Sequence, residues 1–322
     1  MHRVVPASQR RTVDELVDRL DLASGDTGAK RSAFWTMLAL SGVIAISGVV
    51  GNSAATVIGA MIVAPLSTPI LGVGLGIAIG RGRLVAQSLL LVLSGVLLIV
   101  GLGFLFAQFL PNATHVLANS QVLGRTSPTL MDLTAALATG LVGAIAVTRR
   151  DVGDVLPGVA IAISLVPPLA VVGVCLGSDA PALALGAFVL FASNVIAMMI
   201  TATVVLVAAG YAREAGENTA HRGRAYLVLG IALIVVAVPM VVNSLSSLWA
   251  GQIAEATRHW LRDVPDAQVT DVTLGSNTAT IDILAPDDIL PPIAELQQSV
   301  DDLLPWSPTV VVVQTVGRHL SR

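Results

Sequence analysis

Two long apolar stretches of the chain each hold a pair of prolines beside hydroxyl-bearing residues. The residues concerned are Pro65, Ser67, Thr68 and Pro69 in the first stretch, and Ser164, Pro167 and Pro168 in the second. Proline lacks an amide hydrogen and its ring clashes with the preceding helical turn. Each stretch therefore predicts a helix that is broken part-way along, with the first break between Pro65 and Pro69.

A broken helix exposes backbone groups that can bind ions. Carbonyls before a break can hold a cation, and amides at the start of the following half-helix attract an anion. The serine and threonine hydroxyls add further ligands at the same level. We therefore predict a central binding site where the two breaks approach each other, built from the seven residues above. The alternative is that the prolines only kink helices for packing.

Other polar groups inside the apolar stretches are few. Asn194 follows Ser193 in mid-segment and either lines a pathway or makes an interhelical hydrogen bond. Asp132 is placed to cap the start of a helix. Because no acidic or basic residue lies deep in a stretch, a proton-driven carboxylate mechanism is disfavoured. Backbone dipoles and hydroxyls are left to do the binding, which suits a small anion or a neutral solute.

The sequence offers no catalytic or cofactor-binding set. The five histidines lie outside the apolar stretches without the spacing of metal ligands, and no nucleophile–base pair or phosphate-binding loop is present. Gly72, Gly76 and Gly80 recur every four residues inside an apolar stretch, which indicates close helix packing rather than a dinucleotide fingerprint. We predict neither enzymatic activity, nor a cofactor, nor a metal site.

The elements that must position these residues are membrane helices. The chain is 54% hydrophobic and 12% charged, whereas a soluble domain carries about a quarter charged residues. Seven stretches approach or exceed the length of about 20 residues that crosses a bilayer. They are Ala33–Val50, Ser53–Gly80, Leu84–Leu110, Thr129–Val147, Val155–Leu176, Pro181–Gly210 and Ala225–Leu248. The predicted fold class is an all-α polytopic membrane protein with two proline-broken helices.

The distribution of cations predicts the orientation. If the N-terminus is inside, thirteen lysines and arginines fall in cytoplasmic segments ahead of the C-terminal region, and only Arg125 falls outside. Cytoplasmic loops of membrane proteins carry such an excess. We expect a multi-pass cell-membrane protein with a cytoplasmic N-terminus and an extracytoplasmic C-terminus. The net charge of −3 gives no electrostatic argument for nucleic acid as a partner.

The chain contains a weak internal repeat at an offset of 99 residues. Matching positions include Gly59 and Gly158, Leu66 and Leu165, Pro69 and Pro168, and Gly74 and Gly173. The predicted repeats are residues 33–110 and 129–210, followed by an additional helix at 225–248. Each repeat has three spans, an odd number, so the copies must cross the membrane in opposite senses. Inverted repeats with interrupted spans are typical of secondary transporters.

Two terminal regions flank this predicted core. Residues 1–32 form a cytoplasmic segment with a short amphipathic helix, Val13–Leu22, interpreted as a solvated anchor. Residues 251–322 predict a small α+β domain outside the membrane. Its elements are strands Gln268–Leu274 and Thr278–Leu284, helix Ile293–Leu304 and strand Thr309–Val316.

The motifs GNSAATVIGAMIVAPLSTPILGVGLG, GVAIAISLVPPLAVVGV and LFASN resemble a known family. It is the prokaryotic integral membrane family called the uncharacterised hydrophobic domain, a domain of unknown function numbered 389. The resemblance covers roughly Ser32–Gly210 and implies an integral membrane location, without a substrate or binding residues. The C-terminal domain lies outside it.

We therefore expect a secondary transporter or facilitator of a small anion or neutral solute, with the lipid bilayer as a partner and, in a homo-oligomer, a second copy of the chain. One alternative is a channel with the same pore. The other is a membrane scaffold or sensor whose C-terminal domain binds a partner.

Overall fold

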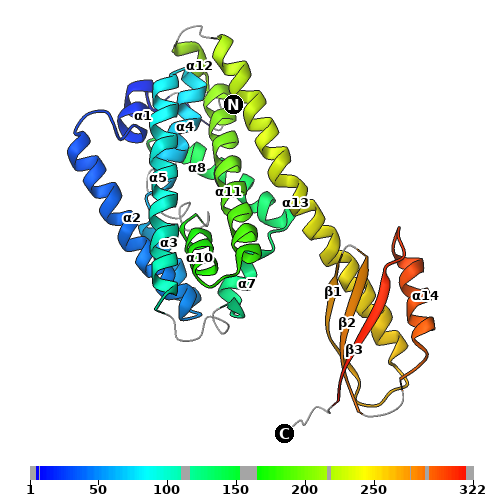
Figure 1. Cartoon of the computed structure of the whole chain (residues 1–322). Coiled ribbons are helices and arrows are strands. Elements are labelled where there is room, and N and C mark those ends of the chain that lie inside the picture. Colours follow the sequence, from blue (N-terminus) through cyan, green and yellow to red (C-terminus); the bar gives the residue numbers. More distant parts are fainter. Residues whose placement is uncertain are drawn as a thin grey trace. The chain divides into compact units, whose positions relative to one another are not determined.

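The computed structural model describes residues 5–6, 8–109, 117–152, 165–215, 219–275, 277–286 and 290–316. The chain forms two compact units, Met1–Met240 and Val241–Arg322. The first unit is helical, and the second contains a small sheet (Figure 1). The boundary between the units lies within one long helix, Thr219–Trp260. The helix is continuous through residue 251, where the sequence predicted the start of the C-terminal domain.

Eleven described helices begin in the first unit, and the last of them continues into the second unit. They are α1 (Val13–Leu20), α2 (Thr27–Val50), α3 (Ala54–Val63), α4 (Ser67–Ile79), α5 (Gly82–Ala107), α7 (Ser120–Thr126), α8 (Leu130–Thr148), α10 (Val166–Gly177), α11 (Pro181–Ala208), α12 (Tyr211–Glu214) and α13 (Thr219–Trp260).

Several of these helices have the length and composition of membrane spans. Five in the described residues qualify singly, and α3 with α4 makes a sixth if the pair is one span. The first part of the predicted span Val155–Leu176 lies outside the described residues, so the count of seven stays a prediction. The coarser statement holds: the protein is mostly helical, with about five membrane-length apolar helices and a small C-terminal sheet.

Polar side chains set where the helices begin. The side chain of Asp26 accepts a hydrogen bond from the amide of Ala29 at 3.0 Å, which starts α2 well before the predicted boundary at residue 32. Asp132 accepts from the amide of Thr129 at 2.7 Å, which confirms its predicted capping role. These caps satisfy amides that have no partner inside the helix.

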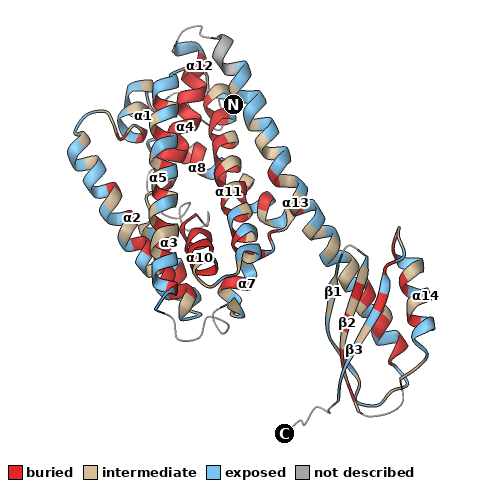
Figure 2. Cartoon of the chain, viewed as in Figure 1, coloured by how far each residue is buried: buried red, intermediate tan, exposed pale blue. Residues whose placement is uncertain are grey.

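Helices α4 and α10 form the centre of the first unit. Each packs against both α5 and α11, and nearly every described residue of the two short helices is buried (Figure 2). By contrast α5 exposes apolar side chains such as Leu90 and Leu97. A helix that is apolar all round belongs in the interior of a bundle, as α4 and α10 do here.

The glycines of α4 allow neighbouring elements to approach closely. A Cβ atom on Gly72 would lie 2.8 Å from Oγ of Ser88 on α5 and 3.0 Å from the carbonyl oxygen of Leu20. A Cβ atom on Gly76 would lie 2.7 Å from a methyl group of Val85, also on α5. The packing role predicted for Gly72 and Gly76 is confirmed, whereas Gly80 ends α4 as its left-handed C-cap, with φ of 74°.

The two central helices run in opposite directions. Helix α4 ends at the end of the bundle that holds α1, because Gly72 packs against Leu20 and Gly80 leads into α5. Helix α10 ends beside the other end of α5, where Nε2 of Gln108 donates to the carbonyl of Gly177 at 3.1 Å. Their first residues, Ser67 and Val166, stand at the 99-residue offset found in the sequence.

The second unit has the predicted order of elements. Strands β1 (Gln268–Leu274) and β2 (Thr278–Ala285) pair antiparallel, and β3 (Thr309–Val316) pairs parallel to β2. Alternate residues of β2 are buried, beginning with Ala279, and they pack with α14 (Ile293–Leu303) and the last turns of α13. The small α+β unit is confirmed, with α13 running into it as one continuous helix.

Candidate functional site

Two short helices meet near the first proline pair, and the break between them lies at a slightly different place from the one predicted. Helices α3 and α4 are separated by Ala64, Pro65 and Leu66 and are bent by 48°. Ser67 and Thr68 are already helical, and Pro69 lies in the first turn of α4. Proline is tolerated in a first turn because its missing amide hydrogen would have no helical partner there. The prediction that Pro65 and Pro69 bracket the break is therefore wrong at its second boundary.

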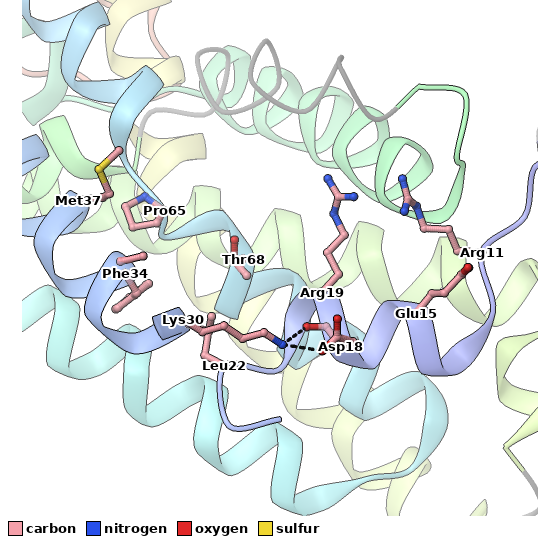
Figure 3. A pocket seen from close by; sticks show the side chains of 11 residues that line it. Arg11, Glu15, Asp18, Arg19, Leu22, Lys30, Phe34, Met37, Pro65 and Thr68 are labelled. Atoms are coloured by element: carbon pink, nitrogen blue, oxygen red, sulfur yellow. Dashed lines mark hydrogen bonds and ion pairs between the residues drawn. The ribbon is translucent and has the colours of Figure 1, made fainter. Parts of the chain in front are cut away.

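A cavity of about 600 Å³ opens beside this break. Its walls come from the N-terminal segment, from α2 and from the start of α4 (Figure 3). The lining residues are Arg11, Glu15, Asp18, Arg19, Leu22, Lys30, Ala33, Phe34, Met37, Pro65 and Thr68. Five of these residues are charged, so the cavity has a charged wall beside the break between α3 and α4.

Helix α1 holds the charged wall in place through its apolar face. Leu16 and Leu20 are fully or almost fully buried, and α1 packs on α4. Its first turn is fixed by a capping box, in which the amide of Thr12 donates to Glu15 and the amide of Glu15 donates to the Thr12 hydroxyl. The helix read from sequence as a solvated anchor is thus part of the core of the first unit.

Hydrogen bonds connect the N-terminal segment just before α1 with the end of α8 and with the start of α12. The amide of Arg11 donates to the carbonyl of Thr148 at 2.9 Å, and the amide of Arg150 donates to the carbonyl of Gln9 at 2.9 Å. The hydroxyl of Tyr211 donates to the carbonyl of Arg11 at 2.7 Å. The segment therefore connects the end of α8 with the start of α12 while forming one wall of the cavity.

Both acidic residues of the cavity already have cationic partners. Oδ1 of Asp18 lies 2.7 Å from Nζ of Lys30, and Oε1 of Glu15 lies 2.8 Å from a guanidinium nitrogen of Arg150. The amide of Thr12, followed by Arg150, lowers the pKa of Glu15, so the carboxylate is ionised at neutral pH. The direct ion pairs of both acids are thus made with Lys30 and Arg150 rather than with Arg11 or Arg19.

Arg11 and Arg19 supply the positive charge left over in the cavity. Figure 3 shows both guanidinium groups extending to the same side of the N-terminal segment. Nε of Arg11 donates to the carbonyl of Arg149 at 3.1 Å, and no acidic side chain of the described residues pairs with Arg19. Partial burial, and then the charge of Arg11, lower the pKa of Arg19. An anion between the two groups would relieve their repulsion.

Two of the predicted site residues line this cavity, namely Pro65 and Thr68. Ser67 and Pro69 lie beside them in the first turn of α4. Among the described residues, no side-chain hydrogen bond occupies the N-terminus of α4. The hydroxyl of Thr68 is therefore available to a bound solute.

The other predicted residues lie elsewhere or outside the description. Pro167 and Pro168 are buried in the first turn of α10, and Asn194 is buried in α11. None of the three lines the cavity. Ser164 lies outside the described residues. A single site formed by both breaks therefore stays a prediction.

The charged side of the cavity, formed by Arg11, Glu15, Asp18, Arg19 and Lys30, was not predicted from the sequence as part of the site. Arg11, Arg19 and Lys30 were counted only as evidence of orientation, because membrane-flanking cations are expected on topological grounds alone. The usable signal was the heptad-like spacing of Val13, Leu16 and Leu20, which predicts an apolar face that must be buried somewhere.

The long apolar helices and the buried, broken central helix are compatible with one class, the multi-pass membrane proteins. Residues 61–200 match the family model described as "Domain of unknown function (DUF389)". This part of the chain is therefore similar to that family, as its motifs indicated. The matched range contains the break, α4, α5, α8, α10 and most of α11, so it holds the central helices and excludes the charged wall on α1.

A curated relative comes from the archaeon Methanocaldococcus jannaschii. It is "Uncharacterized protein MJ0678", 30% identical over 206 residues, which are 62% of this chain and 63% of the relative. The chain thus matches less than two thirds of the relative's length. No solved structure matches the chain.

Proposed function

We propose that the protein is a secondary transporter or facilitator of a small anion, which binds beside the broken helix α3–α4. The observation that carries the proposal is the cavity at the break, where both carboxylates have cationic partners, whereas no carboxylate of the described residues forms an ion pair with Arg11 or Arg19. Of the two substrate classes expected from sequence, a cationic cavity favours the anion over the neutral solute. Thr68 would add a hydroxyl and α4 its positive N-terminal end.

An inverted repeat would give such a site two-sided access, and equivalent contacts in the two halves support it. A Cβ atom on Gly74 would lie 2.6 Å from Cβ of Ala202, and one on Gly173 would lie 2.8 Å from Cα of Gly103. Gly74 and Gly173 differ by the repeat offset, and so do Gly103 and Ala202. Helix α4 therefore packs on α11 through the same positions that α10 uses on α5.

In this proposal the two halves exchange roles during transport. The membrane-spanning unit rocks about the central helices, as in other transporters with discontinuous helices. The cavity described above would be the access route on the side of α1, the cytoplasmic side according to the distribution of cations. Ser164, Pro167 and Pro168 would belong to the equivalent break of the second half.

The test is anion flux in reconstituted vesicles. Purified protein is loaded with chloride, nitrate, sulfate or phosphate in turn, and efflux is followed with an ion-selective electrode or radiotracer. Arg19→Gln should slow the flux of the transported anion at least fivefold, because it removes one of the two cavity arginines that form no ion pair with an acid of the described residues. The matched control is Arg31→Gln, an exposed arginine on α2 that does not line the cavity.

Equal flux in the wild type and in Arg19→Gln would remove the cavity from the proposal. Pro69→Ala and Pro168→Ala test the helix breaks separately, and full activity in both variants would overturn the role given to them. Saturation of flux and counterflow distinguish a carrier from a channel with the same pore.

The scaffold or sensor alternative makes a different prediction. If the C-terminal domain binds a partner, removal of residues 251–322 should abolish function while variants at the breaks remain active. In a transporter the order of effects is reversed.

A further inference from the structure

A second hollow, of about 650 Å³, lies within the first unit between α4, α5, α11 and α13. Among the described residues its lining is apolar except for one arginine. The residues are Val73, Gly76, Ile77, Gly80, Gly82, Val85, Ala86, Leu89, Ile196, Met199, Arg224, Ala225, Val228, Leu229 and Ala232. None of them belongs to the cavity at the helix break.

The hollow exists because α13 packs loosely on its neighbours. Within the first unit the buried side chains of α13 are Val236 and Met240, which pack with Leu133, Ala136 and Ala197. Ala232, one helical turn before Val236, borders the hollow. Nearer the start of α13, Leu227 and Val228 are 64% and 63% exposed. In a bilayer a hydrocarbon chain must fill a gap of this kind, because water there would leave its hydrogen bonds unmade.

The hollow has the shape and polarity of a lipid rather than of a compact solute. Ala225, Val228, Leu229 and Ala232 recur at helical spacing and form an apolar strip along α13. If a methylene group takes about as much space as a water molecule, about 30 Å³, the hollow has room for roughly twenty of them. That is the size of one acyl chain.

Charge complementarity identifies the head group. Arg224 stands at the end of the apolar strip, beside the turn Gly80–Gly82, and no acidic side chain of the described residues pairs with it. That turn also carries the exposed Arg81. Basic pockets between membrane helices at the cytoplasmic surface bind anionic lipid head groups.

We propose that this groove between α13 and α4–α5 binds an anionic phospholipid, with an acyl chain along the apolar strip and the phosphate at Arg224. The inference does not depend on the proposed transport function, because the two hollows share no residue.

Native mass spectrometry of the purified protein tests the proposal, with phosphatidylglycerol and phosphatidylcholine as probes. The wild type should retain phosphatidylglycerol in preference. Arg224→Gln should reduce that preference about fivefold, since one arginine near a membrane surface contributes about 1 kcal/mol. Arg213→Gln is the matched control, an exposed arginine of α12 outside the groove.

Filling the groove tests the acyl chain separately. Ala232→Phe should lose both lipids, whereas Ile231→Phe, on the neighbouring exposed position, should retain them. If Ala232→Phe does not fold, Val228→Phe serves in its place. An unchanged lipid preference in Arg224→Gln, lipid retention in the filled variant, or displacement of phosphatidylglycerol by millimolar inorganic phosphate would each overturn the proposal.

Discussion

Two hollows of nearly equal volume, about 600 Å³ and about 650 Å³, border opposite parts of the same short helix, α4. The first touches the start of α4 at Thr68 and is lined by five charged residues. The second touches its later turns at Val73, Gly76 and Ile77 and is lined by one charged residue. Because the two volumes are nearly equal, the lining side chains rather than the volume should determine which ligand each hollow binds.

The difference arises from the elements that close each hollow. The charged cavity is closed by α1, a helix with polar residues on one side and Leu16 and Leu20 on the other. The groove is closed by α13, whose lining side is apolar over two turns. Changes in α1 should therefore affect the anion cavity alone, and changes in the strip of α13 should affect the lipid groove alone.

The largest effect is expected from Leu16→Ala, which should detach α1. Leu16 is 0% exposed, and truncating such a leucine costs about 2–5 kcal/mol of unfolding free energy. Denaturant titration in detergent measures the loss. Leu97→Ala is the control, because Leu97 is 74% exposed on α5 and should change stability by less than about 0.5 kcal/mol. Loss of phosphatidylglycerol retention in Leu16→Ala would contradict the separation of the two hollows.

Gly72→Ala should have the next largest effect. The new methyl group would lie 2.8 Å from Oγ of Ser88 and 3.0 Å from the carbonyl oxygen of Leu20. Such overpacking costs about 1–3 kcal/mol and should push α1 away from α4. The control is Gly59→Ala, where the added carbon meets nothing within 4 Å and helix propensity should rise. If both variants melt at the same temperature, the close contact of α1 with α4 is not as described.

The fold was predictable from the sequence where polar and apolar residues follow a regular pattern along an element. In the second unit, polar and apolar residues alternate in β2, and the Gly275 turn ends β1, so the predicted strands agree with the observed ones to within a residue. In the first unit, the apolar runs marked the helices but not their ends. A run such as that of α2 is apolar on every side, so its start depends on the single cap at Asp26.

The site was only half predictable. Proline chemistry located the break near Pro65, because a missing amide hydrogen acts locally. Arg11 and Arg19 of the cavity come from the N-terminal segment, about fifty residues earlier in the chain, and their approach depends on how Leu20 packs against Gly72. A contact between distant segments leaves no trace in the composition or spacing of either segment alone.

Charge reversal should separate the two hollows functionally. Arg19→Glu should lower anion flux about tenfold or more, because it places a carboxylate beside the proposed anion. Arg224→Glu should leave flux within about twofold of the wild type and abolish the preference for phosphatidylglycerol. Anion flux in vesicles and native mass spectrometry are measured on both variants. An equal loss of flux in Arg224→Glu and in Arg19→Glu would contradict the separate functions of the two hollows.

The smallest effect is expected from acidification, and it should be confined to the wall formed by α1. The amide of Thr12, and then Arg150, hold the pKa of Glu15 below its ordinary value of 4.5. The stability that Glu15 contributes is therefore fully present above about pH 4.5 and is lost as the pH falls through the lower, folded-state pKa. Melting curves of wild type and Glu15→Gln should differ slightly at neutral pH and converge in acid. A difference between wild type and Glu15→Gln that persists unchanged to pH 3 would rule out the ionised pair as a support of the cavity wall.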